Sequence, residues 1–546
     1  MSSTLYRGGV VHSPADPFAE AVLVEDGVVA WLGADDTADG FAARADEVID
    51  LDGALVAPGF VDAHVHVLET GLSLESIDLG ASGGVRTLAD ALDAVRRAAA
   101  GRPGDRREEP LLGFGWDEGD WPEGRPPSRT ELDAAAGGAP VYLARADIHS
   151  AVVSSALAER AGLPALEGWR DDGLVVRDAH HGARDAVRDL TPATRTRLYR
   201  AALEHAAARG VVSVHEHSAP GIDTRAGLVE LLELTGEPGS ALPHLVAYRG
   251  EVCVTVDDAR EILAAVPGLT GLGGDLNVDG SLGSRTAALR APYSDASAGS
   301  GSLYLSAERI TNHVTAASRA GLQSGFHVIG DRAMDEVLLG LRAACDVEGV
   351  PALARTGIRL EHAEMVDAPA LATLLLLGVT LSVQPAFDAA WGGPDGMYSH
   401  RLGAGRAATL NPFADLAGAG VPLAFGSDAP VTPVDPWAGV RAAVEHHATE
   451  QRISARAAFR AATRGGWRLA GPEHWGTGDL RVGAPAHLAV WRADHLAVQA
   501  PDGRLSAWNP DAQAGTPLLP LLGGDEPPPS CLRTVRAGVT IFDTLG

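Results

Sequence analysis

The sequence predicts an α/β protein: a (β/α)8 TIM-like barrel with a small composite β-domain built from both chain ends. Two observations support the barrel. Ala/Leu-rich helical stretches alternate with short apolar runs through the middle of the chain, and at least five of these runs end in polar residues. Continuous apolar runs are typical of buried parallel strands, and polar residues at the carboxyl ends of many strands favour a barrel over a doubly wound sheet. A third observation, the β-branched texture of both ends, predicts the second domain.

Residues 1–57 and 473–546 contain short β-branched runs that Gly, Asp and Pro interrupt. The dipeptide Asp26-Gly27 lies between two such runs and is a strong hairpin signal. The same texture returns near the carboxyl end, in CLRTVRAGVTIFD. We therefore expect the two ends to pair in one composite β-sandwich domain, with residues 58–472 forming the barrel.

Within the barrel segment, four helical stretches stop at a glycine, and an apolar run follows each one. Glycine at this position suits the left-handed cap of a helix. Residues 75–190 depart from the pattern, because GRPGDRREEP and GWDEGDWPEGRPPSR are rich in Gly, Pro and charge, which is typical of loops. We expect a lid-like insertion there that covers the active site. The four glycines are Gly210, Gly321, Gly378 and Gly420.

The composition excludes several kinds of function. The 546 residues carry a net charge of −27, and all 44 basic residues are arginine. Without lysine the chain cannot form a Schiff base, a P-loop phosphate contact or a lysine carbamate. The acidic balance also argues against nucleic acids and anionic membranes as partners.

Three scattered cysteines predict neither a disulfide framework nor a cysteine-based zinc cluster. The amino-terminal residues lack the charged and apolar regions of a signal peptide, and no apolar run is long enough to span a membrane. We therefore expect a cytoplasmic protein that acts on a small molecule, with homodimer formation left open.

The strongest local motif is PGFVDAHVH, an apolar strand that ends in His64-x-His66. Alternate residues of a strand point to the same side, so both imidazoles can reach one ion, and imidazole suits zinc and similar divalent metals. Three later runs end in His327, His362 and Asp428. A catalytic metal site needs three or four such ligands at one rim and an open position for water. These residues therefore predict a divalent metal at the barrel mouth, with zinc favoured.

The motifs together resemble the metal-dependent amidohydrolase superfamily, most closely its N-substituted formamide deformylase-like branch. The resemblance implies a (β/α)8 barrel with a composite β-domain and one or two divalent metals. It matches His64 and His66 to ligands on the first strand, His327 and His362 to ligands on the fifth and sixth, and Asp428 to the aspartate of the eighth. The motifs that follow the branch's order are PGFVDAHVH, GWDEGDW, DGSLGSRTA, HVIGDRA, RLEHAE, SVQP and GSDAPV.

One departure from the family pattern concerns the fourth strand, where many members carry a carboxylated lysine that bridges two metals. The matching position, four residues before the Asp of DGSLGSRTA, is Asp275. Either the Asp275 carboxylate ligates or bridges two ions, or the site holds a single ion. A carboxylate is an acceptable ligand, but it is shorter than a carboxylated lysine, which slightly favours the single ion. His215 and His217 end another strand and are rival ligands if Asp275 is not one.

The resemblance implies a hydrolase that cleaves a non-peptide C–N bond of a small amide-like substrate, using water that the metal activates. Asp428 is expected to take the proton of the attacking water and return it to the leaving nitrogen. A deaminase or cyclic-amide hydrolase with the same chemistry is one alternative. A catalytically inactive binding protein on the same fold is another, which the loss of the lysine keeps open.

Several other residues are candidates for binding the substrate. Trp116 and Asp117 lie in the Gly-rich segment GFGWDEGDW, which predicts either a lid over the substrate or a packed aromatic beside solvated acids. Arg285 follows the fourth strand and could grip a carboxylate or carbonyl through its guanidinium. His149 follows an apolar strand and could face the pocket, and Gln384 is a further candidate for substrate contact.

Overall fold

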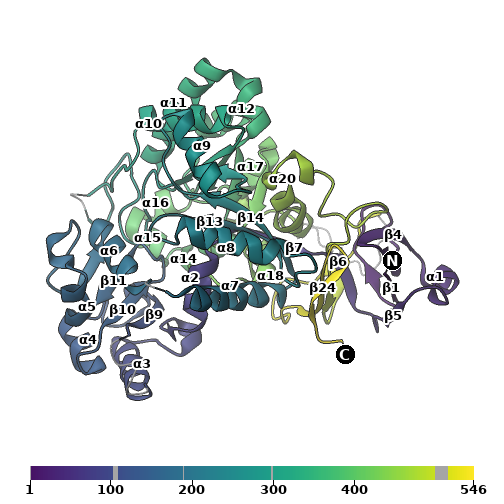
Figure 1. Ribbon diagram of the computed structural model, residues 1–546, viewed down its shortest axis with the longest axis horizontal. Coiled ribbons are helices and arrows are strands. Elements are labelled where there is room, and N and C mark those ends of the chain that lie inside the picture. The colour runs from purple at the N-terminus through teal and green to yellow at the C-terminus, as the bar shows by residue number, and fades with distance from the viewer. Residues whose placement is uncertain (1, 103–108, 189, 297–298, 499–514, 546) are drawn as a thin grey trace.

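The computed structural model describes residues 2–102, 109–188, 190–296, 299–498 and 515–545, and its centre is an eight-stranded sheet in which every neighbouring pair is parallel. A parallel bridge between Val65 and Ala429 brings the two outermost strands together, so the sheet is nearly closed. The predicted α/β barrel is therefore confirmed (Figure 1). In order around the barrel the strands are β7 (Phe60–Val65), β13 (Val211–Ser218), β14 (His244–Arg249), β15 (Gly271–Leu272), β16 (Gln323–Val328), β17 (Ile358–His362), β18 (Thr380–Val383) and β19 (Leu423–Phe425).

Helices cover the outside of the barrel, and their ends follow ordinary capping chemistry. Thr191, Thr224 and Ser306 are amino-terminal caps whose side chains accept a backbone N–H of the first turn. Gly378 and Gly420 adopt the left-handed conformation as the carboxyl-terminal caps of their helices, as the sequence predicts. The covering helices include α7 (Pro192–Ala207), α8 (Arg225–Gly236), α9 (Val256–Ala265), α10 (Ala307–Arg319), α11 (Asp331–Glu348), α13 (Ala368–Leu377), α17 (Phe413–Ala419) and α18 (Pro436–Val444).

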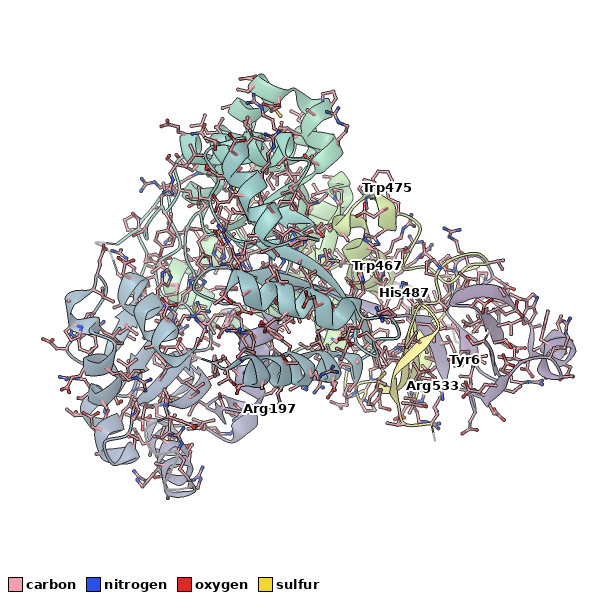
Figure 2. All side chains as sticks on the ribbon, in the orientation of Figure 1. Tyr6, Arg197, Trp467, Trp475, His487 and Arg533 are labelled. Atoms are coloured by element: carbon pink, nitrogen blue, oxygen red, sulfur yellow. The ribbon has the colours of Figure 1, made fainter. Side chains whose placement is uncertain are left out.

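Strands from both ends of the chain share a second unit, at the right of Figure 1. One of its sheets, in the order β2-β6-β20-β23-β24, joins two amino-terminal strands to three carboxyl-terminal strands. Tyr6, Val56, Leu488 and Val535 are buried in a single core there; Figure 2 labels Tyr6 and the nearby Arg533. The strands are β4 (Val28–Gly33), β3 (Ala21–Glu25), β1 (Ser3–Arg7) and β5 (Glu47–Asp50) in one sheet, and β2 (Val10–Val11), β6 (Leu55–Pro58), β20 (Leu488–Arg492), β23 (Ser530–Arg536) and β24 (Val539–Asp543) in the other.

The segment expected to be a loop-like lid contains a folded unit with its own five-stranded sheet, at the lower left of Figure 1. Leu88, Val95, Leu132 and Leu143 are buried in a core separate from that of the barrel. Within the loop-like stretch GRPGDRREEP, residues 103–108 lie outside the described part of the chain. The elements are β8 (Ile77–Asp78), β9 (Leu111–Trp116), β10 (Val141–Arg145), β11 (Ser150–Val153), β12 (Leu174–Val176), α3 (Leu88–Ala100), α4 (Arg129–Ala136), α5 (Ser155–Arg160) and α6 (Arg177–Val187).

A buried network of ion pairs within the insertion is hydrogen-bonded to the barrel. The Arg145 guanidinium, 2% exposed, lies 2.7 Å from Asp117 Oδ1 and 3.3 Å from Asp147 Oδ2. Asp147 in turn accepts a hydrogen bond of 2.6 Å from the Ser281 hydroxyl, which belongs to the loop after β15. Separating these groups would leave a buried charge uncompensated. The network therefore holds the insertion against the mouth of the barrel. Nowhere in the described residues does a helix have the length and apolar character needed to cross a membrane.

Candidate metal centre

The six predicted ligands meet at the carboxyl ends of the barrel strands. The strand order explains this, because parallel strands direct all their carboxyl ends to one rim. All six side chains are buried or nearly so. His64 and His66 come from the end of β7, Asp275 from the loop after β15, His327 from β16, His362 from the end of β17, and Asp428 from the loop after β19.

The distances between donor atoms suit direct coordination of a metal. Asp428 Oδ1 lies 3.3 Å from the Nε2 atoms of both His64 and His66. Asp275 Oδ1 lies 3.1 Å from His327 Nδ1 and 3.2 Å from His362 Nε2. Two ligands that each lie about 2.0–2.1 Å from one tetrahedral ion are about 3.3 Å apart, so these spacings match neighbouring positions in a coordination shell.

The second nitrogen of each imidazole is held by an acceptor of the protein. His64 Nδ1 lies 2.8 Å from Glu361 Oε2, and His362 Nδ1 lies 2.8 Å from Gln384 Oε1. His66 Nδ1 lies 3.1 Å from the carbonyl oxygen of His217, and His327 Nε2 lies 3.3 Å from that of Gly280. Because these oxygens only accept, each imidazole donates outward and turns its other nitrogen toward the carboxylates. Imidazoles that ligate a metal have this arrangement.

The surroundings of the candidate ligands favour a bound cation. His64 Nε2 is a buried nitrogen without a hydrogen-bond partner among the described residues. Burial raises the pKa of Asp428, but the attraction of the charged form to His64 and the close approach of both first-strand imidazoles lower it below its ordinary value. For Asp275, burial likewise raises the pKa, and hydrogen bonding and charge from His327 outweigh this effect. Both carboxylates are therefore ionised near neutral pH, the form in which they bind a cation.

A glycine pair allows the short side chain of Asp275 to reach this centre. Gly273 and Gly274 follow β15 directly with φ values of +94° and +66°. A Cβ on Gly273 would lie 2.0 Å from Gly325 O, and one on Gly274 would lie 2.5 Å from His217 Nδ1. Only glycine fits so close to its neighbours at these φ values, and the backbone thus carries Asp275 inward to the four imidazoles.

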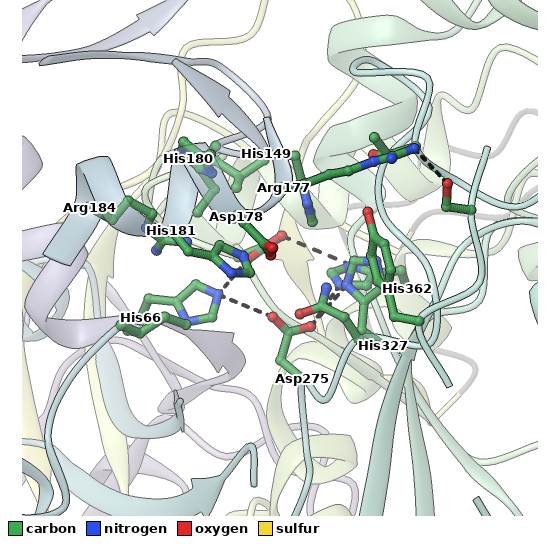
Figure 3. A pocket seen from close by; sticks show the side chains of 18 of the residues that line it. His66, His149, Arg177, Asp178, His180, His181, Arg184, Asp275, His327 and His362 are labelled. Atoms are coloured by element: carbon green, nitrogen blue, oxygen red, sulfur yellow. Dashed lines mark hydrogen bonds and ion pairs between the residues drawn. The ribbon is translucent and has the colours of Figure 1, made fainter. Parts of the chain in front are cut away.

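A cavity of about 520 Å³ opens above these ligands. Its wall includes His66, Asp275, His327, His362 and Asp428, which places the candidate metal centre at its floor (Figure 3). A volume of this size suits a small-molecule substrate. The insertion forms part of the wall through Ile148, His149, Glu167, Arg177, Asp178, His180, His181 and Arg184.

Comparison with known proteins agrees with this geometry, since residues 47–542 match the amidohydrolase family model. The chain belongs to the amidohydrolase family. It is 27% identical to the protein YtcJ of Bacillus subtilis over 467 residues, 81% of this chain and 83% of that one. It is also 32% identical to the N-substituted formamide deformylase of Arthrobacter pascens over 162 residues, 29% of each chain.

Among solved structures, the amidohydrolase resembles an uncharacterized metal-dependent hydrolase from Pyrococcus furiosus. The TM-score is 0.68 at 29% identity, and the match covers 89% of this chain and 98% of the other. Together with the family match and the histidine–carboxylate clusters, this neighbour identifies a hydrolase of the amidohydrolase type that uses a divalent metal.

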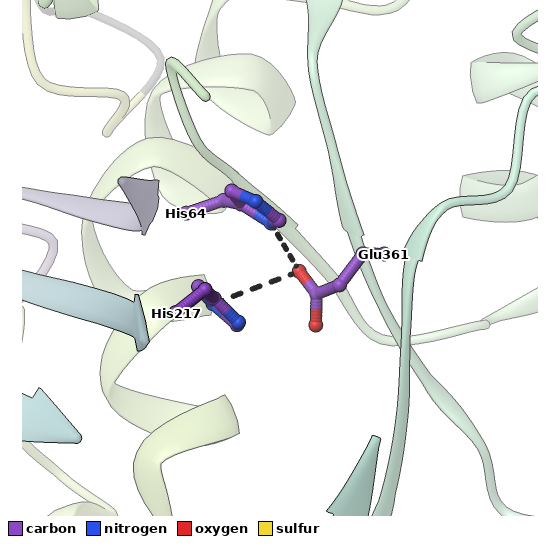
Figure 4. Close-up of side chains that lie close together, drawn as sticks. All are labelled: His64, His217 and Glu361. Atoms are coloured by element: carbon purple, nitrogen blue, oxygen red, sulfur yellow. Dashed lines mark hydrogen bonds and ion pairs between the residues drawn. The ribbon is translucent and has the colours of Figure 1, made fainter. Parts of the chain in front are cut away.

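His215 and His217, which the sequence offers as alternative metal ligands of this amidohydrolase, lie in a second layer below the candidate ligands. The His217 ring stacks on that of His64 at a centroid distance of 4.1 Å, and its Nε2 lies 3.9 Å from Glu361 Oε2 (Figure 4). Arg359 Nη1 donates to His215 Nδ1 at 3.0 Å, and Arg359 Nη2 donates to Glu361 Oε2 at 3.0 Å. A buried guanidinium already balances the Glu361 charge, which disfavours a further cation there.

Glu361 and Arg359 were missed in the sequence as functional residues, although the segment IRLEH contains both. Alternation along β17 places them on one side of the strand, where Glu361 meets His64 and Arg359 donates to the carbonyl oxygen of Ala63 on the first strand. Gln384, considered as a substrate contact, instead accepts a hydrogen bond from His362. These three side chains orient the imidazoles rather than lining the cavity.

We predict that Glu361→Gln lowers the affinity for the metal about 10–100-fold, which is typical for loss of a partner that orients a ligand. The amide keeps the shape of the side chain but removes the charge that His64 and Arg359 share. Competition with a chelator, followed by metal analysis, measures the change. Glu261→Gln, at a side chain that is 75% exposed, is the matched control and should leave affinity unchanged; equal affinities for all three proteins would contradict the role.

The candidate substrate residues have different placements. His149 lines the cavity, and its ring centroid lies 5.4 Å from that of His327. Trp116 is buried in the core of the insertion, where its indole N–H donates to Leu143 O at 2.8 Å. Arg285 forms a two-bond ion pair with Asp295, at 2.7 and 3.1 Å.

Asp117 pairs with Arg145 in the network described above. Trp116, Asp117 and Arg285 are absent from the described lining of the cavity, since each is occupied by an internal partner. Each partner lies ten or more residues away along the chain, outside the motif that contains the candidate residue.

Proposed function

We propose that this protein hydrolyses a non-peptide C–N bond in a small amide-like substrate, with zinc as the metal. One observation supports this most directly: four imidazoles, each anchored through its outer nitrogen, turn the other nitrogen toward two ionised carboxylates at the floor of a cavity. Such a donor set of nitrogen and oxygen atoms suits zinc. When bound, a divalent ion lowers the pKa of a coordinated water and polarises a carbonyl group.

Two side chains that line the cavity account for the remaining steps of the reaction. Asp428 faces the cavity with its Oδ1 beside both first-strand imidazoles, so it can accept a proton from the attacking water and return it to the leaving nitrogen. His149 lines the same space without a side-chain hydrogen bond to any described residue, and burial lowers its pKa to about 4. A neutral imidazole there can donate to the substrate carbonyl oxygen.

The arrangement supports two ions rather than the single ion that the length of the Asp275 side chain favours. His64, His66 and Asp275 form one group of donor atoms lying within 4.8 Å of one another, and Asp275, His327 and His362 form another. Asp275 belongs to both groups, with Oδ1 toward His327 and His362 and Oδ2 3.7 Å from His66 Nε2. We infer that its carboxylate would help to hold both ions.

The test combines metal analysis with a substrate panel. The purified protein should contain close to two ions per chain and should release formate or another acid from simple amides, N-substituted formamides among them. Removal of the metal by a chelator should abolish turnover, and added zinc should restore it. Release of ammonia from an amidine-type ring would favour a deaminase, and opening of a cyclic amide would favour the ring hydrolases. Stoichiometric metal without hydrolysis of any substrate would contradict the proposal and favour an inactive binding protein.

A further inference from the structure

Helix α6 of the insertion presents a polar face to the cavity. Arg177, His180, His181 and Arg184 all line the cavity, and their spacing of three to four residues places them along one side of the helix. A neighbouring side of the helix buries Ala179, Ala183 and Val187 in the main hydrophobic core. The face that points toward the candidate metal centre is therefore the polar one, although a helix packed on a protein usually buries apolar residues.

Arg184 is distinctive on this face because it is buried but only partly paired. The residue is 9% exposed, and its Nη2 donates to Glu69 Oε1 at 3.0 Å. Arg188, one turn further on, pairs with the same oxygen of Glu69. The other N–H groups of Arg184 have no hydrogen-bond partner in the described part of the chain. A guanidinium has five N–H donors, so most of those on Arg184 remain available to a ligand.

The other basic side chains on the wall do not offer a comparable charge. Arg177 lies at the rim, where it pairs with Glu167 and donates to the Ser302 hydroxyl at 2.8 Å. His180 is engaged within the insertion, since its Nε2 lies 2.9 Å from the Tyr142 hydroxyl, and burial lowers its pKa well below its ordinary value. Arg184 is thus the buried arginine of the described wall, and it shares its acid, Glu69, with Arg188.

From this geometry we propose that Arg184 binds a carboxylate group of the substrate, so that the substrate class is an amide that also carries a carboxylate. The planar guanidinium matches a carboxylate through two parallel hydrogen bonds. In the view of Figure 3, Arg184 lies on the same side of the cavity as His66, and His327 and His362 lie on the other. A bound amide would therefore place its carbonyl over the candidate metal centre and its carboxylate against α6. The identity of the scissile bond in this inference rests on the proposed function, whereas the contact between Arg184 and the carboxylate does not.

A structural role for Arg184 as a partner of Glu69 is the competing explanation. Arg188 remains beside Glu69 when Arg184 is replaced, so Arg184→Gln should fold and keep the Glu69 charge compensated. Arg184→Lys retains the positive charge but not the planar guanidinium with its parallel N–H donors, and it serves as a second variant. Arg170→Gln removes an arginine of the insertion that is 60% exposed and pairs with Asp172, and it is the matched control.

The experiment compares two probes that cannot be hydrolysed, N-methylsulfonylleucine and its carboxamide, by calorimetric titration of the metal-loaded protein. The wild type should bind the carboxylate probe more tightly than the carboxamide. Arg184→Gln should weaken binding of the carboxylate probe about 10–100-fold, as expected for a hydrogen-bonded charge pair, and change carboxamide binding less than about 2-fold. Arg184→Lys should give an intermediate loss, and Arg170→Gln should match the wild type.

Several results would overturn the inference. These are equal binding of the two probes by the wild type, no binding of either, or equal weakening of both by the Arg184 variants. Turnover of N-formylleucine and N-formylleucinamide, followed by formate release, separates the inference from the function. Hydrolysis of both compounds at the same rate would leave the hydrolase intact and refute the carboxylate contact. Binding that is selective for the carboxylate probe, without hydrolysis of either compound, would support the carboxylate contact and contradict the hydrolase function.

Discussion

Replacement of Asp428 by asparagine should lower kcat at least about 1,000-fold while the protein keeps its fold. General acid–base catalysis alone contributes about 10²–10⁴-fold, and the variant also removes a negative charge beside His64 and His66. The backbone contacts of the residue survive, because the N–H of Asp428 still donates to His64 O at 2.8 Å. Asparagine also tolerates the observed φ of +55°.

The measurement is steady-state turnover on whichever amide the panel identifies, with metal content and melting temperature determined on the same samples. Asp435→Asn is the matched control, since Asp435 caps α18 seven residues further along and lies outside the described lining of the cavity. Asparagine is an equally good cap, so activity should be unchanged. Activity of Asp428→Asn within about 10-fold of the wild type would refute the catalytic role.

Asp275→Asn should halve the metal content or reduce it further, and it should lower kcat/KM at least about 100-fold. Four imidazole nitrogens surround the carboxylate, and an amide offers one neutral oxygen where the carboxylate offers two charged ones. Elemental analysis after exhaustive dialysis, together with turnover, tests the expectation. Asp257→Asn, at a side chain that is 85% exposed, is the control.

The outcome also decides between one and two ions. A wild type that holds one ion and an Asp275→Asn variant that retains it would exclude the bridging role. Gly274→Ala provides an independent check, because an added Cβ would displace the backbone from His217 and move Asp275 away from the imidazoles. It should reproduce the metal loss although no donor atom is removed.

The sequence was sufficient to predict the barrel and the meeting of its histidines for one physical reason. Parallel strands share a carboxyl edge, so residues at the ends of separate apolar runs must approach one another once the strands are identified. His64, His327, His362 and Asp428 illustrate this, since each ends or follows a barrel strand. The folded insertion was less visible, because its short strands and glycine-rich connections resemble a loop in local composition.

Pairings across the fold could not be predicted from local patterns. Arg285 has the chemistry of a substrate ligand, but Asp295, ten residues away, occupies its guanidinium. Asp117 similarly meets Arg145 across 28 residues. How far the side chain of Asp275 reaches toward the imidazoles depends on two left-handed glycines and the space beside Gly325, which the length of the side chain alone does not reveal.

The glycine-supported position of Asp275 has a consequence for assembly of the site. A carbamate bridge forms only when dissolved carbon dioxide reacts with an amine after folding, so its occupancy varies with bicarbonate. If Asp275 holds both ions as proposed, the oxygens that contact them belong to an encoded side chain and are present in every molecule of this enzyme. Maturation then needs nothing beyond the folded chain and its ions, and it proceeds equally well in degassed buffer.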